Sequence, residues 1–337
     1  MVRGTSLKAD TPVPQHKLCS ANAMRSIHWF KTAGGTEVSL VVPLLQTSVK
    51  SSTIRRRADT PTDDCLRYAI RHAHQVGLNA NIKVLLELEQ PVVVRTKSGG
   101  TFKSMWRGRI KPANLSEWNR EWSDRIHAYA ALAHEEGART ITIGTEMVGV
   151  TKGNMPFWKA LVRDLHRQYP GLRIAYAANR TGETEGLSRA FVKLLDEFGV
   201  TFYPKFDIDG QLSEAALIRI LKTYTRNLKA TSSKYGREIH IYEWGVRSRL
   251  NTRHETSDGT PGAKSVVSLE EQRIIYSAML RYFDSLTFVK GLHTWMSYTD
   301  PKKGVGSDGV SHDSGYGVQG KPAGKVLAKW FGGKVER

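Results

Sequence analysis

Apolar residues recur in five segments of the chain at the spacing of an amphipathic helix. The first opens with Thr60-Pro61-Thr62-Asp63, where we expect Thr60 to cap the helix, Pro61 to take its first position and Gly77 to end it. Ser268-Leu269-Glu270-Glu271 is a capping box that opens the fourth. The five apolar stripes are Leu66, Ala69, Ile70 and Ala73; Trp118, Trp122, Ile126, Tyr129 and Ala133; Leu217, Ile220, Leu221, Tyr224 and Leu228; Ile274, Ile275, Ala278, Met279 and Tyr282; and Val326, Leu327 and Trp330.

Short β-prone runs alternate with these helical segments, which indicates βαβ units and a parallel sheet. We count eight runs, the number that closes a (β/α)8 barrel. The 337 residues suit a barrel of about 250 residues with long βα loops. No linker or internal repeat divides the chain, so we expect one (β/α)8 catalytic domain over residues 1–337. The eight runs are Val2–Lys8, Thr36–Val42, Ile82–Leu88, Arg139–Thr145, Leu172–Ala177, Val200–Tyr203, Glu238–Tyr242 and Val289–Trp295.

Composition says little about the cellular compartment in which the protein works. No apolar run approaches the roughly 20 residues of a membrane span, and Met1 to Asp10 lack the apolar centre of a secretory signal. A polysaccharide substrate would nevertheless favour a secreted, periplasmic or cell-surface enzyme, with the cytoplasm as the alternative. Cys19 and Cys65 are too few for a disulfide framework. We expect each to be a buried free thiol, and one bridge between them remains the alternative.

Two β-prone runs stop abruptly on a glutamate: Ile141 to Glu146, and Ile239 to Glu243. Carboxyl ends of barrel strands converge at one mouth, so the two carboxylates should meet there. Cleavage of a glycosidic bond needs such a pair. Strand alternation puts Glu243 on the face of Ile239 and Ile241, and leaves Glu238, His240 and Tyr242 on a helix-facing side, which is oddly polar. A bulge could break this alternation.

Several motifs resemble the clan A glycoside hydrolases. Gly144-Thr145-Glu146, Tyr242-Glu243-Trp244-Gly245 and His293-Thr294-Trp295 are similar to that clan's signatures of strands four, seven and eight. Two further pieces, Trp106-Arg107-Gly108-Arg109-Ile110 and Gly320-Lys321-Pro322-Ala323, narrow the resemblance to the family 113 barrel enzymes, best known as β-mannanases. The similarity runs from about Gly4 to Trp330.

The resemblance implies a retaining, endo-acting β-glycanase that works by double displacement, with a role for each matching residue. Glu146 would be the general acid/base and Glu243 the nucleophile. Tyr203, in Phe202-Tyr203-Pro204, matches a tyrosine that orients the nucleophile, and Trp295 matches an aromatic floor for a sugar ring. Thr145 stands where most clan A families have an asparagine that contacts the sugar 2-hydroxyl. Which residue of this chain binds that hydroxyl is therefore an open question.

Other residues are weaker candidates for contact with substrate. Trp106 and Arg107 lie in a long loop, where they either bind a subsite or brace the loop. Asn179 leaves the fifth strand toward the mouth. His293 shares the strand parity of Trp295, with a buried structural histidine as the alternative. No phosphate-binding glycine motif is present and His72 and His74 lack ligand geometry, so we expect neither cofactor nor metal.

Charge suggests the kind of substrate. Lys and Arg number 50 against 32 Asp and Glu, a net charge of +18, and three loops that rise beside the two glutamates are strongly basic. Such a rim could steer an anionic glycan or be ordinary solvated surface. A carbohydrate-binding or assembly barrel without catalysis is the alternative function, and a specific nucleic-acid binder is disfavoured because no recognition motif is present. Oligomeric state is undetermined. The basic residues are Lys50, Arg55, Arg56 and Arg57; Arg95, Lys97, Lys103, Arg107, Arg109 and Lys111; and Arg247, Arg249, Arg253 and Lys264.

Overall fold

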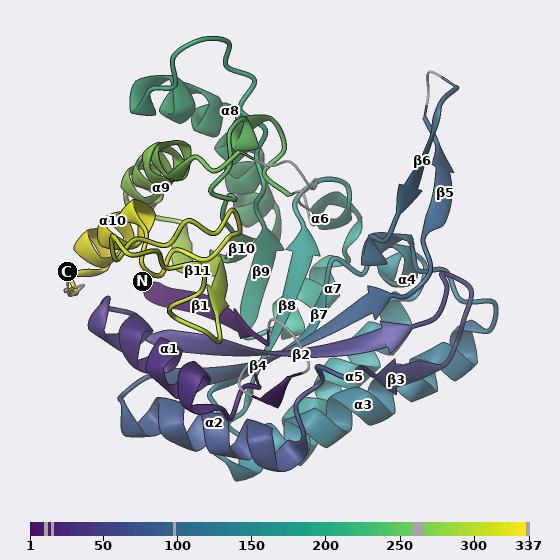
Figure 1. Ribbon diagram of the computed structural model, residues 1–337. Coiled ribbons are helices and arrows are strands. Elements are labelled where there is room, and N and C mark those ends of the chain that lie inside the picture. Colours follow the sequence, from purple (N-terminus) through teal and green to yellow (C-terminus); the bar gives the residue numbers. More distant parts are fainter. Residues whose placement is uncertain (10–12, 15–16, 97–98, 258–265, 335–337) are drawn as a thin grey trace.

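Eight parallel strands form a closed barrel in the computed structural model, which describes residues 1–9, 13–14, 17–96, 99–257 and 266–334 (Figure 1). The order around the barrel is β1-β2-β4-β7-β8-β9-β10-β11, and β11 pairs with β1 to close it. The predicted (β/α)8 barrel is confirmed, and all eight predicted strands are present. Their bounds are β1 Val2–Lys8, β2 Glu37–Gln46, β4 Asn79–Leu88, β7 Thr140–Thr145, β8 Arg173–Asn179, β9 Glu197–Thr201, β10 Ile239–Trp244 and β11 Val289–Tyr298.

Helices surround the barrel, and apolar faces of the strands and helices form the main core between them. Within the described ranges, no helix is both long and apolar enough to cross a membrane. The helices are α1 Ala21–Thr32, α2 Asp63–Gln75, α3 Leu115–Glu135, α4 Val148–Thr151, α5 Met155–Gln168, α6 Glu183–Gly186, α7 Arg189–Leu194, α8 Glu214–Tyr235, α9 Leu269–Asp284 and α10 Pro322–Phe331, with 3-10 turns at Arg107–Arg109 and Thr252–His254.

The two predicted helix caps have different outcomes. Ser268 caps α9 as predicted, because its hydroxyl accepts from the Glu271 N–H at 3.3 Å. Thr62, not Thr60, caps α2. Thr60 is used by the preceding loop instead: its hydroxyl accepts from the Arg57 N–H at 2.7 Å and donates to the Pro43 carbonyl. The helix therefore starts two residues later than its sequence suggests.

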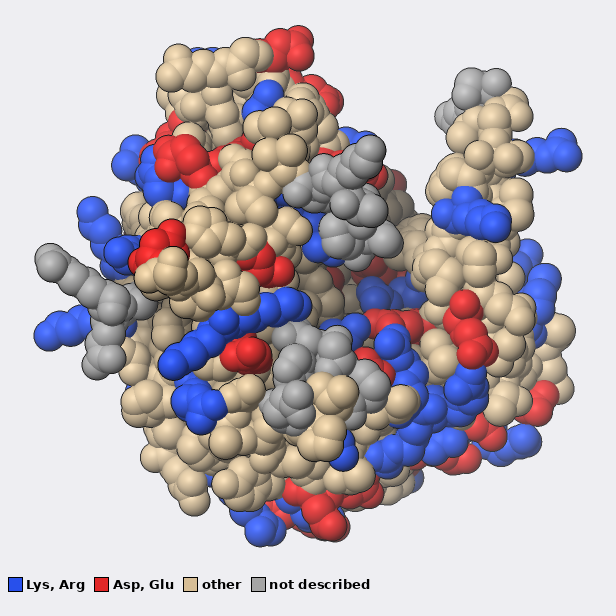
Figure 2. All heavy atoms as spheres, in the orientation of Figure 1, with Lys and Arg blue, Asp and Glu red and all other residues tan. Residues whose placement is uncertain are grey.

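Two additions extend the barrel near its mouth. β3 (Ile54–Arg56) pairs antiparallel with the end of β2. β5 (Val92–Arg95) and β6 (Thr101–Ser104) form a separate antiparallel hairpin directly after β4. Figure 1 shows this hairpin standing well clear of the barrel, and Figure 2 shows it on one side of a hollow in the surface of the molecule.

The barrel interior is polar, which reverses the expected orientation of β10. Ile239 and Ile241 belong to the core between strands and helices, whereas His240 and Tyr242 point inward. The Tyr242 ring stacks on His293 at 4.6 Å inside the barrel. Register shifts follow Ile241 on both sides of β10, so the bulge considered as an alternative is present and carries Glu243 out of strict alternation.

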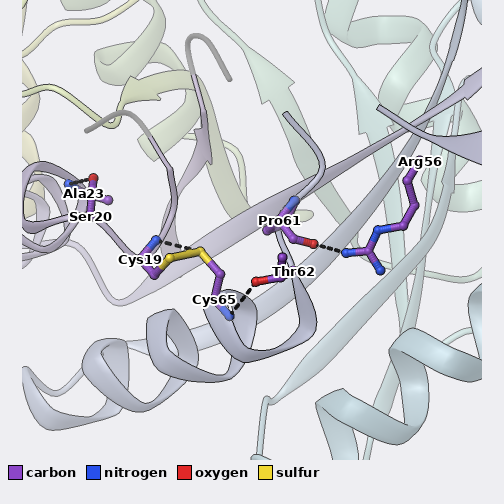
Figure 3. Close-up of a disulfide and its surroundings, with 7 residues drawn as sticks. All are labelled: Cys19, Ser20, Ala23, Arg56, Pro61, Thr62 and Cys65. Atoms are coloured by element: carbon purple, nitrogen blue, oxygen red, sulfur yellow. Dashed lines mark hydrogen bonds between the residues drawn. A yellow bond between two sulfur atoms is a disulfide. The ribbon is translucent and has the colours of Figure 1, made fainter. Parts of the chain in front are cut away.

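Cys19 and Cys65 form a disulfide that ties the segment before α1 to the first turn of α2 (Figure 3). Their Cα atoms are 4.9 Å apart, within the usual range for a bridge. The Cys19 N–H also donates toward Cys65 Sγ at 3.0 Å. The expectation of two free thiols is therefore wrong. The residues lie 46 positions apart, and their pairing depends on the packing of α1 beside α2, which spacing in the sequence does not reveal.

Candidate active site

Glu146 lies directly after β7, at the mouth of the barrel. Its backbone N–H donates to the Ala177 carbonyl of β8 at 2.8 Å. Its φ of +53° falls in the left-handed region that residues other than glycine seldom adopt. Strained backbone of this kind concentrates at functional sites, where the surrounding structure holds it in place.

Three neutral donors and one cation hold the Glu146 carboxylate, and the residue is only 8% exposed. Oε1 accepts from Thr201 Oγ1 at 2.6 Å and from Asn179 Nδ2 at 2.9 Å. Oε2 accepts from Trp106 Nε1 at 2.7 Å, and Arg107 Nη1 lies 3.6 Å from it. These groups come from β8, β9 and the loop after β6, so both oxygens are fixed from different sides.

Glu243, on β10, has a cation as its closest partner. Its Oε1 lies 2.7 Å from Lys83 Nζ, and its Oε2 accepts from the Tyr203 hydroxyl at 3.2 Å. Tyr203 lies just past β9. Burial and the neighbouring Glu243 charge raise the pKa of Tyr203 well above its ordinary value. The phenol therefore stays protonated and can donate to Glu243.

Thr201 links the two glutamates. It pairs with Glu243 in the register of β9 and β10, and its hydroxyl donates to Glu146. The charges of both glutamates also act on Tyr203. The structure thus brings Glu146 and Glu243 together at one mouth. Figure 2 shows the molecule hollowed on this face, between the β5–β6 hairpin and the part built on α8 and α9, with acidic and basic side chains inside the hollow.

Lys83 is a site residue that the sequence reasoning missed. It lies inside the barrel on β4, has no exposed surface, and also donates to the Tyr242 carbonyl at 3.2 Å. Burial lowers the pKa of Lys83, while the Glu243 charge opposes that shift. Its ammonium sits 5.1 Å from the Trp295 ring centroid. The available signal was a lysine in the middle of an otherwise apolar strand, since buried lysines are rare unless paired.

The Trp106-Arg107-Gly108 segment fits tightly beside Glu146. A Cβ on Gly108 would overlap the Trp106 ring, so glycine allows that ring to fold back over the chain. A Cβ on Gly149, in α4, would likewise overlap the Ile110 carbonyl. Arg107 Nε donates to the Leu86 carbonyl at 3.0 Å. The segment is therefore fixed between β4 and α4, and Trp106 and Arg107 both brace the loop and reach Glu146.

A buried carboxyl supports Asn179 from behind. Glu183 accepts from the Asn179 N–H at 2.7 Å, from the Tyr176 hydroxyl at 2.5 Å and from the Thr151 hydroxyl at 3.1 Å. Burial raises the pKa of Glu183 to about 7. This second acid was also missed, and it fixes the strand end from which Asn179 reaches Glu146.

His293 points into the barrel but does not reach the mouth, so its predicted contact with substrate is wrong. It is fully buried and pairs in register with Gly4, which also pairs with Glu37, the first residue of β2. Its Nδ1 lies 3.3 Å from Ser39 Oγ, and its Nε2 lies 3.6 Å from Glu37 Oε1. The ring therefore belongs to the interior near the opposite end of the barrel.

Trp295 and Thr145 have different exposures. Trp295 is half-buried, above Lys83, where one face of the ring could meet a sugar. Thr145 is 1% exposed, and no partner for its hydroxyl is found in the part of the chain that is described. Substrate contact by either residue stays a prediction.

A family profile described as Glycoside Hydrolase Family 113 matches residues 13–321. The chain belongs to this family. It is a glycoside hydrolase with the barrel that its motifs imply. No curated protein sequence matches it.

Solved structures agree on the fold of this family 113 chain. A GH113 β-1,4-mannanase in complex superposes with a TM-score of 0.77 at 19% identity, covering 98% of each chain. The GH113 β-mannanase AaManA from Alicyclobacillus acidocaldarius gives a TM-score of 0.79 at 20% identity, over 98% of this chain and 97% of that one. A Lactobacillus rhamnosus β-glucuronidase gives 0.61 at 12% identity, covering 98% of this chain but 49% of that one.

Much of the predicted basic rim of this family 113 enzyme is neutralised. Arg55 pairs with Glu89 at 2.6 Å and Arg56 with Asp63 at 3.1 Å. Arg57 pairs with both Asp59 and Glu87, and Arg253 with Glu271. Five rim cations, however, form no ion pair with any described residue: Lys50, Arg95, Lys103, Arg109 and Lys111. Lys97 and Lys264, two further residues of the predicted rim, lie outside the described ranges.

Proposed function

We propose that this enzyme is a retaining β-glycanase in which Glu243 is the nucleophile and Glu146 the general acid/base. We assign these roles from the difference between the groups that contact the two glutamates. A buried ammonium contacts Glu243 at 2.7 Å, and an opposite charge at this distance suits the group that attacks as a carboxylate. Glu146 is held by three neutral donors, and its nearest cation is 3.6 Å away.

The chemistry follows from these positions. Glu146 protonates the glycosidic oxygen while Glu243 attacks the anomeric carbon, which releases the leaving sugar and forms a glycosyl-enzyme ester. Glu146, now ionised, takes a proton from water, and the resulting attack on the anomeric carbon releases Glu243 as a carboxylate. Tyr203 and Lys83 contact the two Glu243 oxygens, so they fix the carboxylate and stabilise the charge that returns to it when the ester breaks.

We propose a β-mannan-type polysaccharide as substrate, cleaved internally. Support comes from the family and from the two similar structures described as mannanases. The half-buried Trp295 beside the nucleophile's lysine offers an aromatic face for one sugar ring. The unpaired rim cations extend the proposal to anionic glycans, whose capture they would favour.

Substitution of each glutamate tests the reaction. Glu146→Gln and Glu243→Gln should each abolish turnover of β-mannan and retain the wild-type thermal melting profile. An added small nucleophile such as azide should restore turnover of an activated aryl glycoside by Glu146→Gln with retention of the anomeric configuration, because azide attacks the glycosyl-enzyme ester. Any product rescued in Glu243→Gln should instead have the inverted configuration. Turnover that survives either substitution would contradict the role given to that glutamate, whereas a wild-type protein that binds mannan without cleaving it would favour a carbohydrate-binding role for the barrel.

Salt tests the anionic extension separately. Rates on an acidic polysaccharide should fall as ionic strength rises, whereas rates on neutral mannan should change little. If the two substrates respond alike to salt, the rim does not steer substrate and the anionic extension fails.

We also propose that the enzyme works outside the cytoplasm, since disulfides such as Cys19–Cys65 persist chiefly in oxidising compartments. Thiol labelling of the enzyme taken directly from the culture medium or cell envelope checks this. Two reactive thiols in the freshly isolated enzyme would contradict it.

A further inference from the structure

The β5–β6 hairpin presents one aromatic side chain to solvent. Phe102 is 47% exposed and lies directly across the ribbon from Val94. Alternation along the two strands puts Val92, Val94 and Phe102 on one face, and Val93 and Lys103 on the other. An isolated exposed apolar residue needs no explanation. Phe102 is different because of what lies beside it.

A cation connects Phe102 to the catalytic pair. The Arg109 guanidinium lies 5.8 Å from the Phe102 ring centroid and 5.9 Å from that of Trp106. The Trp106 ring in turn donates to Glu146. Phe102, Arg109 and Trp106 therefore form a continuous series from the hairpin down to the proposed acid/base.

Arg109 keeps donors available for a ligand. Its Nε donates to Ser104 Oγ at 3.3 Å, and it forms no ion pair with any carboxylate of the described residues. A planar guanidinium held against two rings keeps a fixed direction for its remaining N–H groups. An exposed aromatic face beside oriented donors matches a pyranose, which has an apolar C–H face and a rim of oxygen atoms.

We propose that Phe102 and Arg109 form a distal subsite for a sugar unit of a long glycan. Phe102 stacks on the pyranose ring, and Arg109 donates to its ring substituents. The inference rests on the proposed hydrolase and deepens it: the enzyme binds units well away from the scissile bond and therefore prefers long chains. Substrates too short to reach the hairpin do not use this subsite.

Chain-length dependence tests the subsite. We would measure kcat/KM for β-1,4-linked manno-oligosaccharides of increasing length. Phe102→Ala should lower kcat/KM for long substrates about three- to tenfold, the range expected for loss of one aromatic contact, and leave the shortest cleaved substrate unchanged. Phe102→Trp should retain the length dependence. Val93→Ala is the matched control, since Val93 is 62% exposed on the opposite face of the same ribbon.

Binding measurements separate this inference from the hydrolase proposal. Calorimetry with the same oligosaccharides on Glu243→Gln and on Glu243→Gln/Phe102→Ala reports the subsite without turnover. Weaker binding of long chains alone supports the subsite, even if the wild-type enzyme hydrolyses none of them. No change for long chains, an equal loss at every length, or the same loss in Val93→Ala would overturn it.

Discussion

Replacing Lys83 with methionine isolates the ion pair at the proposed nucleophile. Methionine keeps a similar length and removes the ammonium that lies 2.7 Å from Glu243. Both partners are buried, so solvent cannot replace the lost charge. Breaking a buried pair from one side costs about 3–5 kcal/mol, because the other charge is left uncompensated. Glu243 relieves that cost by binding a proton.

The proton on Glu243 defines the kinetic result. A protonated carboxyl cannot attack the anomeric carbon, so kcat/KM near neutral pH should fall roughly 100- to 1000-fold if most of that cost appears in the reaction. Raising the pH removes the proton, and activity should recover in part. The acidic limb of the pH profile of kcat/KM should therefore move to higher pH.

Full pH profiles of wild type and Lys83→Met are the assay. Lys321→Met is the control. Lys321 is 3% exposed, pairs at 3.1 Å with Asp313 in the loop after β11, and donates to Ser248 in the loop after β10, so it ties the two loops together. Its loss should reduce stability and leave the acidic limb in place. A Lys83→Met enzyme with a folded melting profile, an unmoved acidic limb and kcat/KM within about twofold of wild type would refute this account of Lys83.

Three further outcomes follow from individual contacts. Trp106→Phe removes the 2.7 Å donor to Glu146 and should lower kcat/KM roughly 10- to 100-fold in steady-state assays, because this donor stabilises the negative charge that Glu146 gains as it gives up its proton to the glycosidic oxygen. Cys19→Ser opens the disulfide to Cys65 and should lower the free energy of unfolding by about 2–4 kcal/mol in urea titration, without loss of kcat. Burial and the nearby Glu197 charge raise the pKa of Glu37 from 4.5 to about 8, so the folded state holds a proton that the unfolded state releases. Stability should therefore fall as pH rises from 4.5 to 8, and Glu37→Gln should flatten that fall by at most about 1.4 kcal/mol per pH unit, measured by thermal melts across pH.

The strands were more predictable than the helices. Each barrel strand carries a run of β-prone residues, and all eight were found within a few residues of their bounds. Helix α5 was omitted although Trp158, Leu161, Val162 and Leu165 form a regular buried stripe that sequence does reveal. Helix α1 is harder to see, because its buried face includes Ala23 and Ser26, and such small or polar residues weaken the apolar pattern.

Glu146 and Glu243 could be located because strand ends converge in a barrel, whereas their partners could not. Lys83 contacts Glu243 from β4 and Thr201 contacts Glu146 from β9. Glu183, at the start of α6, contacts the backbone of Asn179, which itself binds Glu146. Nothing local in the sequence pairs a lysine at position 83 with a glutamate 160 positions later. Such contacts depend on the order and register of strands around the closed barrel, which only the fold determines.

One feature of the sequence could have corrected the inside-out assignment of β10. In β4, Ile82 and Val84 face the helices while Asn81 and Lys83 face inward; in β7, Ile141 and Ile143 face the helices. A barrel surrounded by amphipathic helices needs its apolar strand face outside, whatever fills the interior. Applied to β10, this rule places Ile239 and Ile241 outward and leaves Glu243 facing away from the mouth unless the strand bulges. The bulge is therefore a requirement of the site, because without it the carboxylate could not meet Lys83.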